Sequence, residues 1–299
     1  MTDRIMDAPC APVAGAHGSS TGRASEPQRS TTSETAGYRG TPEAKPPHAT
    51  LLSALRAEAL KSRRAAPMRI AVAMALPMPL LGAMPVNGYQ AFSAWNYWYA
   101  LFLPVAVSLF TACVAQADAR SGMRGVLGQG APLGCAWWAK ALWCLALSAV
   151  ANLVVFAVYL AGSAFTAQGL TAAGTLTMLC CAAANTLTTA WMIPAALALC
   201  TGAGMLAGIF APLAIQIAGA FAWSLVPVPQ LLPPCATVVI PTAFIPVLPS
   251  GEPLAADTAL GGALAGDAAL IWGGLAICAA AFVLLTSASA AWFARSEER

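Results

Sequence analysis

The sequence predicts an all-α integral membrane protein with six transmembrane helices. Of the 299 residues, 59% are hydrophobic and only 9% are charged, whereas a soluble domain usually carries about 25% charged residues. The apolar residues also gather in runs of about 20, the length that a helix needs to cross a bilayer. Sparse charge and long apolar runs together exclude an ordinary soluble domain.

The first 50 residues differ from the rest of the chain. They are rich in Ala, Ser, Thr, Gly and Pro and almost lack large apolar side chains. Such a segment cannot bury enough surface to offset the entropy lost on ordering. We therefore expect residues 1–50 to be a disordered low-complexity tail, or the product of a start codon assigned too early. The segment also lacks the pattern of a signal peptide.

Residues 51–66 predict an amphipathic helix at the membrane interface. Leu52 and Ala59 belong to its apolar face, while Glu58 and Lys61 point away from that face. Because an apolar run follows at once, we expect this helix to rest on an anionic membrane surface just before the first span.

Residues 67–299 form the predicted transmembrane domain. We expect its six spans at 70–88, 97–116, 141–165, 172–197, 202–225 and 267–290. Each run is close to the ~20 residues that a bilayer demands. The turn between the fourth and fifth spans is so short that the boundary between them is less well defined than those between the other spans.

The positions of Lys and Arg predict that both termini are cytoplasmic, because cytoplasmic loops carry an excess of basic residues. Basic residues precede the first span, lie between the second and third, and follow the sixth. They are Arg56, Lys61, Arg63, Arg64, Arg69, Arg120, Arg124, Lys140, Arg295 and Arg299. The loops assigned to the outside contain none. The pattern predicts a multi-pass protein of the cell (plasma) membrane.

Aromatic residues at the ends of spans are candidate interfacial anchors, because Trp and Tyr are enriched at membrane–water interfaces. Trp95 and Trp98 mark the outer end of the second span, and Trp137 and Trp138 mark the inner end of the third. We expect all four side chains to face the headgroup region.

A proline-rich segment precedes the sixth span. Seven prolines between positions 227 and 249 argue against a regular helix, because proline lacks the backbone N–H that a helix interior requires. We expect an external or partly re-entrant segment that packs on the helix bundle.

Motifs for several kinds of enzyme are missing from the sequence. A P-loop ends in Gly-Lys-Ser/Thr, and no lysine of this chain follows a glycine. Both histidines lie in the tail, and the cysteines show no zinc-binding spacing. We therefore expect no enzymatic activity in this chain and no metal or cofactor of its own.

Three amides fall near the middle of predicted spans: Asn152 in the third, Asn185 in the fourth and Gln216 in the fifth. Two interpretations stay open. The amides form interhelical hydrogen bonds, each worth roughly 0.6 kcal/mol, or they line a substrate path.

The segment 120–140 is the main charged island between the long apolar runs. Its five glycines provide flexibility, and Pro132 interrupts any single helix. With basic and small residues exposed on the cytoplasmic side, the segment is either a docking surface for a partner or an ordinary basic loop that sets orientation.

Four short motifs follow one another along residues 51–299. AEALKSRRAAP precedes the first span, WNYWYALFLP opens the second, WWAKALWCLAL opens the third, and PVLPSGEPL lies in the late external segment. Their order and spacing resemble ABC-2-type transporter permeases of the lantibiotic-immunity (lantibiotic protection) family.

The resemblance implies a permease subunit of an ABC exporter that clears a lantibiotic-type antimicrobial peptide from the membrane, giving self-immunity. Its implied partners are a cytoplasmic ATPase subunit that binds ATP, a second permease in a homodimer or heterodimer, membrane lipid and the peptide substrate, with no nucleic acid. The implied ATPase-coupling loop contains Arg120, Arg124, Leu127, Leu133 and Lys140.

Two alternative functions stay open beside this one. The first keeps the ABC architecture but exports a drug, lipid or other small molecule. The second is an ATP-independent carrier or a membrane scaffold.

Overall fold

The computed structural model describes residues 50–62, 65–83, 96–120, 132–164, 171–245, 247 and 268–297. These residues are all-helical and contain no β-strand, which confirms the predicted all-α fold. Apart from Thr50, the predicted tail lies outside the described residues.

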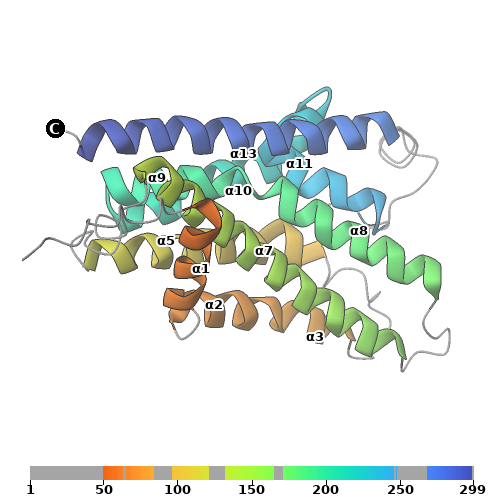
Figure 1. The fold of residues 1–299 in the computed structure, drawn as a ribbon. Coiled ribbons are helices and arrows are strands. Elements are labelled where there is room, and N and C mark those ends of the chain that lie inside the picture. Colours follow the sequence, from red (N-terminus) through yellow and green to blue (C-terminus); the bar gives the residue numbers. More distant parts are fainter. Residues whose placement is uncertain are drawn as a thin grey trace, which may run out of the picture. The chain divides into compact units, whose positions relative to one another are not determined.

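Among the described residues, five helices are long and apolar enough to cross a membrane (Figure 1). They are η1 with α5 (Trp98–Phe102 and Leu103–Arg120), α7 (Leu133–Ala164), α8 with α9 (Ala172–Thr188 and Met192–Gly202), α10 with η2 (Met205–Ala222 and Trp223–Leu225), and α13 (Ala268–Glu297). Their length and composition are those of a membrane-embedded, multi-pass protein. They correspond to the second through sixth predicted spans.

The first predicted span is divided into two short helices, α2 (Ala66–Ala75) and α3 (Pro77–Ala83). Pro77 lacks the N–H that would continue the hydrogen bonds of α2, so the helix breaks at Leu76. The joined apolar helix runs from Ala66 to Leu81 and is shorter than the ~20 residues that span a bilayer. Its α2 part packs against α5 and α7.

The fourth and fifth predicted spans meet at a glycine. Helix α9 continues to Gly202, beyond the predicted end of the fourth span, and α10 begins at Met205. Between them Gly204 has φ of 98°, a left-handed conformation that a side chain disfavours. One turn later, a Cβ added at Gly208 would lie 2.1 Å from Cys200 Sγ and 2.8 Å from the backbone oxygen of Ala196. Glycine therefore permits both the turn and the close contact of α9 with α10.

The proline-rich segment contains η3 (Pro229–Leu231), α11 (Pro233–Val239) and η4 (Ile240–Ala243). The expectation that prolines exclude a regular helix is wrong for α11. Pro233 and Pro234 occupy its first turn, where the backbone N–H has no helical partner in any case. Helix α11 is buried against α8, α10 and α13, as expected for a segment that packs on the bundle.

Candidate functional site

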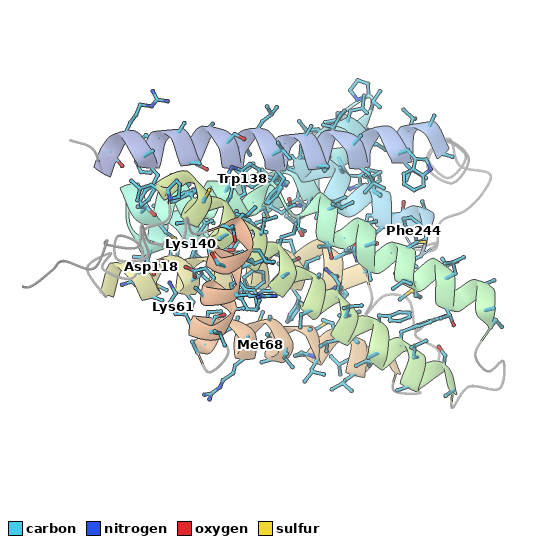
Figure 2. The ribbon with its side chains drawn as sticks, viewed as in Figure 1. Lys61, Met68, Asp118, Trp138, Lys140 and Phe244 are labelled. Carbon is cyan, nitrogen blue, oxygen red and sulfur yellow. The ribbon has the colours of Figure 1, made fainter. Side chains whose placement is uncertain are left out.

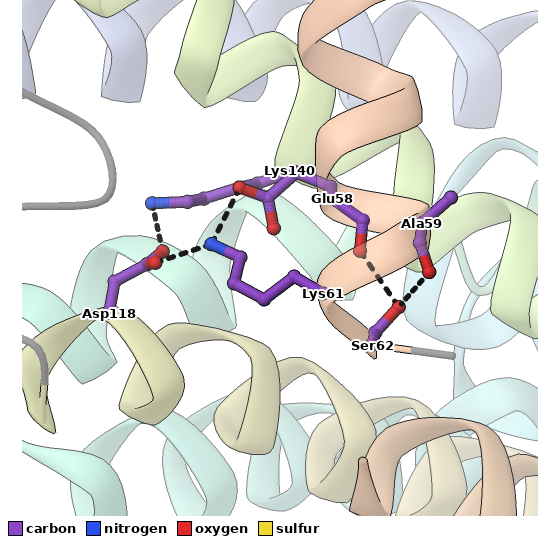
Figure 3. A network of polar contacts seen from close by, with 6 residues as sticks. All are labelled: Glu58, Ala59, Lys61, Ser62, Asp118 and Lys140. Atoms are coloured by element: carbon purple, nitrogen blue, oxygen red, sulfur yellow. Dashed lines mark hydrogen bonds and ion pairs between the residues drawn. The ribbon is translucent and has the colours of Figure 1, made fainter. Parts of the chain in front are cut away.

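Four charged side chains meet near the C-terminal end of α5 and the N-terminal part of α7. Figure 2 labels three of them, Lys61, Asp118 and Lys140. Glu58 and Lys61 come from α1 (Leu51–Ser62), Asp118 from α5 and Lys140 from α7. Lys61 Nζ lies 2.9 Å from Glu58 Oε1 and 2.5 Å from Asp118 Oδ1. Lys140 Nζ pairs with Asp118 Oδ2 (Figure 3). We call these four residues the charge cluster.

The charge cluster is buried and electrically balanced. Asp118 is 1% exposed, and Glu58 and Lys140 are each 4% exposed. Burying a charge is costly unless it is paired and hydrogen-bonded. Here two carboxylates face two ammonium groups, so each charge has a partner of opposite sign. Removing one member would leave another charge buried without compensation.

Lys61 is the most accessible member of the charge cluster, with 33% of its side chain exposed. Partial burial by itself lowers the pKa of Lys61, because it disfavours the charged form. The hydrogen bonds to Asp118 and Glu58 outweigh this effect and hold the pKa above its ordinary value. Lys61 therefore stays charged and joins the two carboxylates.

Helix α1 turns Glu58 toward the protein and leucines outward, so Glu58 points away from the leucine-bearing side, as the sequence predicted. Ala54, Glu58 and Ser62 are buried at helical spacing, and α1 packs on α7. The exposed side carries leucines, among them Leu52 and Leu60. On the inward side, Asp118 and Lys140 provide opposite charges for the polar residues of α1. On the outward side, leucine is stable against lipid. The outward side is mixed, because Arg56 is exposed beside the leucines.

The predicted ATPase-coupling loop is only partly within the described residues. Arg120 is the last residue of α5 and Leu133 the first of α7, so they frame the loop. Arg124 and Leu127 lie outside the described residues. The prediction that Lys140 is an exposed loop residue is wrong. Its side chain is buried within α7 and pairs with Asp118.

Asp118 is the central residue that the sequence analysis missed. It lies at the end of an apolar helix and is buried. One signal was available, because Asp118 is the only acidic residue between Glu58 and Glu252. An ionisable group beside a long apolar run is a functional candidate by default.

A second polar group surrounds Asn152, one of the predicted path residues. Trp98 Nε1 donates to Asn152 Oδ1 at 3.0 Å. Asn152 Nδ2 donates to Ser148 O and to Thr186 Oγ1, each at 3.1 Å. These bonds join η1, α7 and α8, so Asn152 forms the interhelical hydrogen bonds that one of the two interpretations expected.

Asn152 and Asn185 line one small pocket, which also contains Trp98 and Tyr99. We call it the amide pocket. Asn185 is buried and donates only to Cys181 Sγ, at 3.7 Å, among the bonds described for its side chain. The pocket therefore brings together two of the three predicted path residues from α7 and α8.

Gln216, the third predicted path residue, does not line the amide pocket. It is fully buried in α10, and its Nε2 donates to Pro234 O at 2.9 Å. This bond holds α10 against α11. A role for any of the three amides in a substrate path stays a prediction.

The prediction that the four tryptophans are interfacial anchors is wrong for two of them. Trp98 and Trp137 are each 2% exposed, so neither faces the headgroup region. Trp137 donates to Ser289 Oγ at 2.9 Å and stacks on Phe293, with ring centroids 4.7 Å apart. Trp138 is half-buried and meets Phe282 edge-on. Trp95 lies outside the described residues.

Within the described part of the chain, no group of three or more His, Cys, Asp or Glu side chains could hold a metal ion. Comparisons of the chain with protein-family models, with curated proteins and with solved structures found no match. The function is therefore inferred from the chain's own residues and their geometry.

Proposed function

We propose that this chain is the membrane-spanning permease subunit of an ABC exporter, driven by a separate ATPase subunit. Its proposed cargo is a lantibiotic-type antimicrobial peptide, which it would clear from the plasma membrane of the producing cell. In the proposed topology, α2 with α3 is the first of six membrane segments and both termini are cytoplasmic. A second permease completes the pathway.

The charge cluster is the observation that supports this proposal best. Asp118 lies just before the loop at 121–131 and Lys140 lies shortly after it, and their ion pair joins α5 to α7. Lys61 adds α1 to the same unit. A force applied to the loop would therefore reach three helices together. The coupling loop of an ABC permease has to transmit such a force from the ATPase.

An ordinary basic loop does not account for the charge cluster. The positive-inside rule acts through Lys and Arg near the ends of spans, and it requires no pairing with buried carboxylates. Lys140 is buried and paired, and a buried ion pair is weak evidence for stability alone. This favours a docking and coupling role over the ordinary-loop interpretation.

Co-purification with an ATPase tests the proposal. The full chain is co-expressed with the ABC ATPase encoded beside its gene, and the membranes are then solubilised in detergent. Wild type and Arg295→Glu should capture the ATPase, whereas Arg120→Glu/Arg124→Glu should not. Arg295 is the matched control, because it is an exposed basic residue on α13 and not part of the segment 120–140.

A second variant separates docking from coupling. Asp118→Asn should still capture the ATPase, because the loop residues are unchanged, but ATP hydrolysis should no longer drive peptide release from the membrane. If the wild-type chain captures no ATPase under several detergent conditions, the exporter assignment fails. The ATP-independent carrier or scaffold would then take its place.

A further inference from the structure

The buried side of α1 is a single row of residues. Ala54, Glu58 and Ser62 follow one another at intervals of four positions and are 4%, 4% and 6% exposed. This interval places side chains above one another on one side of a helix. Because α1 packs on α7, these residues mark the side that docks on the bundle. We call them the inward row.

A second row lies on the opposite side of α1. Leu52, Arg56 and Leu60 are also four positions apart, and each precedes a residue of the inward row by two positions, which is about 200° around the helix axis. All three are exposed, Leu52 by 57% and Leu60 by 71%. In this outward row an arginine therefore lies between two leucines, about one helical turn from each.

The charge cluster sets the level of α1 along the bundle. Asp118 is the last residue of the apolar segment Trp98–Asp118, which is long enough to cross a membrane. Lys61 of α1 contacts Asp118, so α1 is held where this apolar segment ends. Figure 1 shows α1 running across α7, on which it packs, and not along it. This level and direction are those of a helix in the interface between the apolar core and water.

Helix α1 is too short to be another span. Its 12 residues are about 18 Å long, whereas the hydrocarbon core is about 30 Å thick. In an interfacial helix, apolar side chains reach the boundary of the acyl chains, and long basic side chains extend to the headgroups. The outward row contains both kinds of side chain.

Arg56 determines which headgroup the outward row prefers. Its guanidinium presents N–H donors in a fork that matches two phosphate oxygens. No carboxylate of the described residues pairs with Arg56, so its charge is available to a ligand. Phosphatidylglycerol has a net negative charge, whereas the choline group of phosphatidylcholine offsets the charge of its phosphate. A basic residue near the surface is attracted to the anionic lipid.

We propose that the outward row of α1 binds an anionic phospholipid of the bilayer. Arg56 would bind the phosphate, and Leu52 and Leu60 would lie against the upper part of the acyl chains. Glu58, on the opposite side of the same helix, belongs to the charge cluster. One short helix would therefore connect the charge cluster to the lipid surface. This inference goes beyond the proposed function and applies equally to an exporter, a carrier or a scaffold.

Photo-crosslinking from the outward row tests the proposal. The full chain, with p-benzoylphenylalanine in place of Leu60, is reconstituted in vesicles with equal amounts of phosphatidylglycerol and phosphatidylcholine that carry the same acyl chains. Mass spectrometry measures the adducts of each lipid, and phosphatidylglycerol adducts should outnumber those of phosphatidylcholine. The same probe in place of Trp137, a large side chain that is 2% exposed, should form no lipid adduct.

Variants of exposed residues locate the preference. Arg56→Gln should lower the ratio of phosphatidylglycerol to phosphatidylcholine adducts by about fivefold, the discrimination expected of one basic residue near a charged surface. Arg56→Lys should retain the preference, because the positive charge remains. Arg295→Gln is the matched control, since it removes the same charge from α13, where Arg295 is exposed and its Nε donates to Ala291 O at 3.0 Å. It should leave the ratio at position 60 unchanged.

The same adduct ratio in wild type and Arg56→Gln would overturn the inference, because Arg56 would then not select the lipid. A probe at Leu60 without lipid adducts would also overturn it, whether the probe reacts within the chain, with a co-reconstituted ATPase or not at all. The crosslinking itself needs no ATPase. ATPase capture without a lipid preference therefore rejects this inference alone, and a lipid preference without capture rejects the exporter assignment alone.

Discussion

At the scale of single residues, Asp118 is the member of the charge cluster that holds the others together. It is the carboxylate that contacts both Lys61 and Lys140, and it is the least exposed of the four residues. Loss of its charge would leave the buried Lys140 without the carboxylate that balances it. The cost of such a change comes mainly from the uncompensated charge.

We expect Asp118→Asn to lower the free energy of unfolding by about 3–5 kcal/mol, as is usual when one partner of a buried ion pair is removed. Denaturation of the detergent-solubilised chain measures this change. The double variant Asp118→Asn/Lys140→Met should be more stable than the single variant, because it restores charge balance. A double variant as unstable as the sum of the two single variants would show that the pair does not interact.

The raised pKa of Lys61 predicts a pH dependence at high pH. A basic group whose pKa rises on folding binds its proton more tightly in the folded state. Its stabilising contribution is complete below the unfolded pKa, about 10.4 for lysine, and is lost as the pH rises through the folded pKa. Stability should therefore fall above about pH 10.4, and less steeply in Lys61→Met than in wild type. Parallel curves for the two chains would contradict the role of Lys61.

At the scale of secondary-structure elements, glycines decide where helices approach closely. A Cβ at Gly219 would lie 2.4 Å from Pro234 Cβ, and one at Gly274 would lie 2.4 Å from the backbone oxygen of Gln230. These contacts hold the segment with η3 and α11 against α10 and α13. Gly208 plays the same part between α9 and α10.

We expect Gly208→Ala to destabilise the chain by about 1–3 kcal/mol, the usual cost of adding a methyl group where no space exists. Gly134 in α7 is the matched control, because an added Cβ there meets nothing within 4 Å. Gly134→Ala should cause no loss, since alanine favours a helix more than glycine does. Thermal unfolding of both variants measures the difference, and similar losses would refute the packing explanation.

At the scale of the whole molecule, the exposed surface is apolar over the long helices. On α13, Trp272 is 71% and Leu284 is 68% exposed. Trp292, near the other end of α13, is 42% exposed. The two tryptophans are 20 positions apart (292 − 272), which is about 30 Å along a helix. That distance equals the thickness of a bilayer's hydrocarbon core, about 30 Å, so this pair fits two interfacial positions.

We expect the fluorescence of Trp272 and Trp292 to be quenched by lipids brominated near the headgroup. In vesicles, Trp272→Phe and Trp292→Phe should each lower the quenched fraction of the total emission, because interfacial Trp rings lie at headgroup depth. Trp137→Phe should leave the quenched emission unchanged, since Trp137 is buried. Quenching that depends on Trp137 instead would place the membrane on a different surface.

The helical and membrane-embedded character could be predicted because it depends on quantities summed along the chain. Apolar runs of about 20 residues and sparse charge require backbone hydrogen bonds to be satisfied within each segment, and a helix does this without help from neighbours. The helix break at Pro77 is also a local effect, because it comes from the missing N–H of one proline. Hydropathy averaged over a window of residues does not reveal it.

The charge cluster and the amide pocket depend on contacts between distant positions. Lys61 and Asp118 lie 57 positions apart, and Trp98 and Asn152 lie 54 apart. Helical periodicity assigns each residue to a face of its own helix, but it does not say which faces meet. For α1, periodicity placed Glu58 on the side away from the leucines, but it did not show that this side meets α7.

The sequence by itself determined that this protein is a bundle of apolar helices built for a bilayer, because composition and hydrophobic run length decide the solvent in which a helix is stable. Only the tertiary structure decided which polar side chains are buried together. Glu58, Lys61, Asp118 and Lys140 tolerate burial because packing brings opposite charges within bonding distance. The same packing buries Tyr99 Oη and Asn185 Oδ1 beside one small pocket without a hydrogen-bond partner.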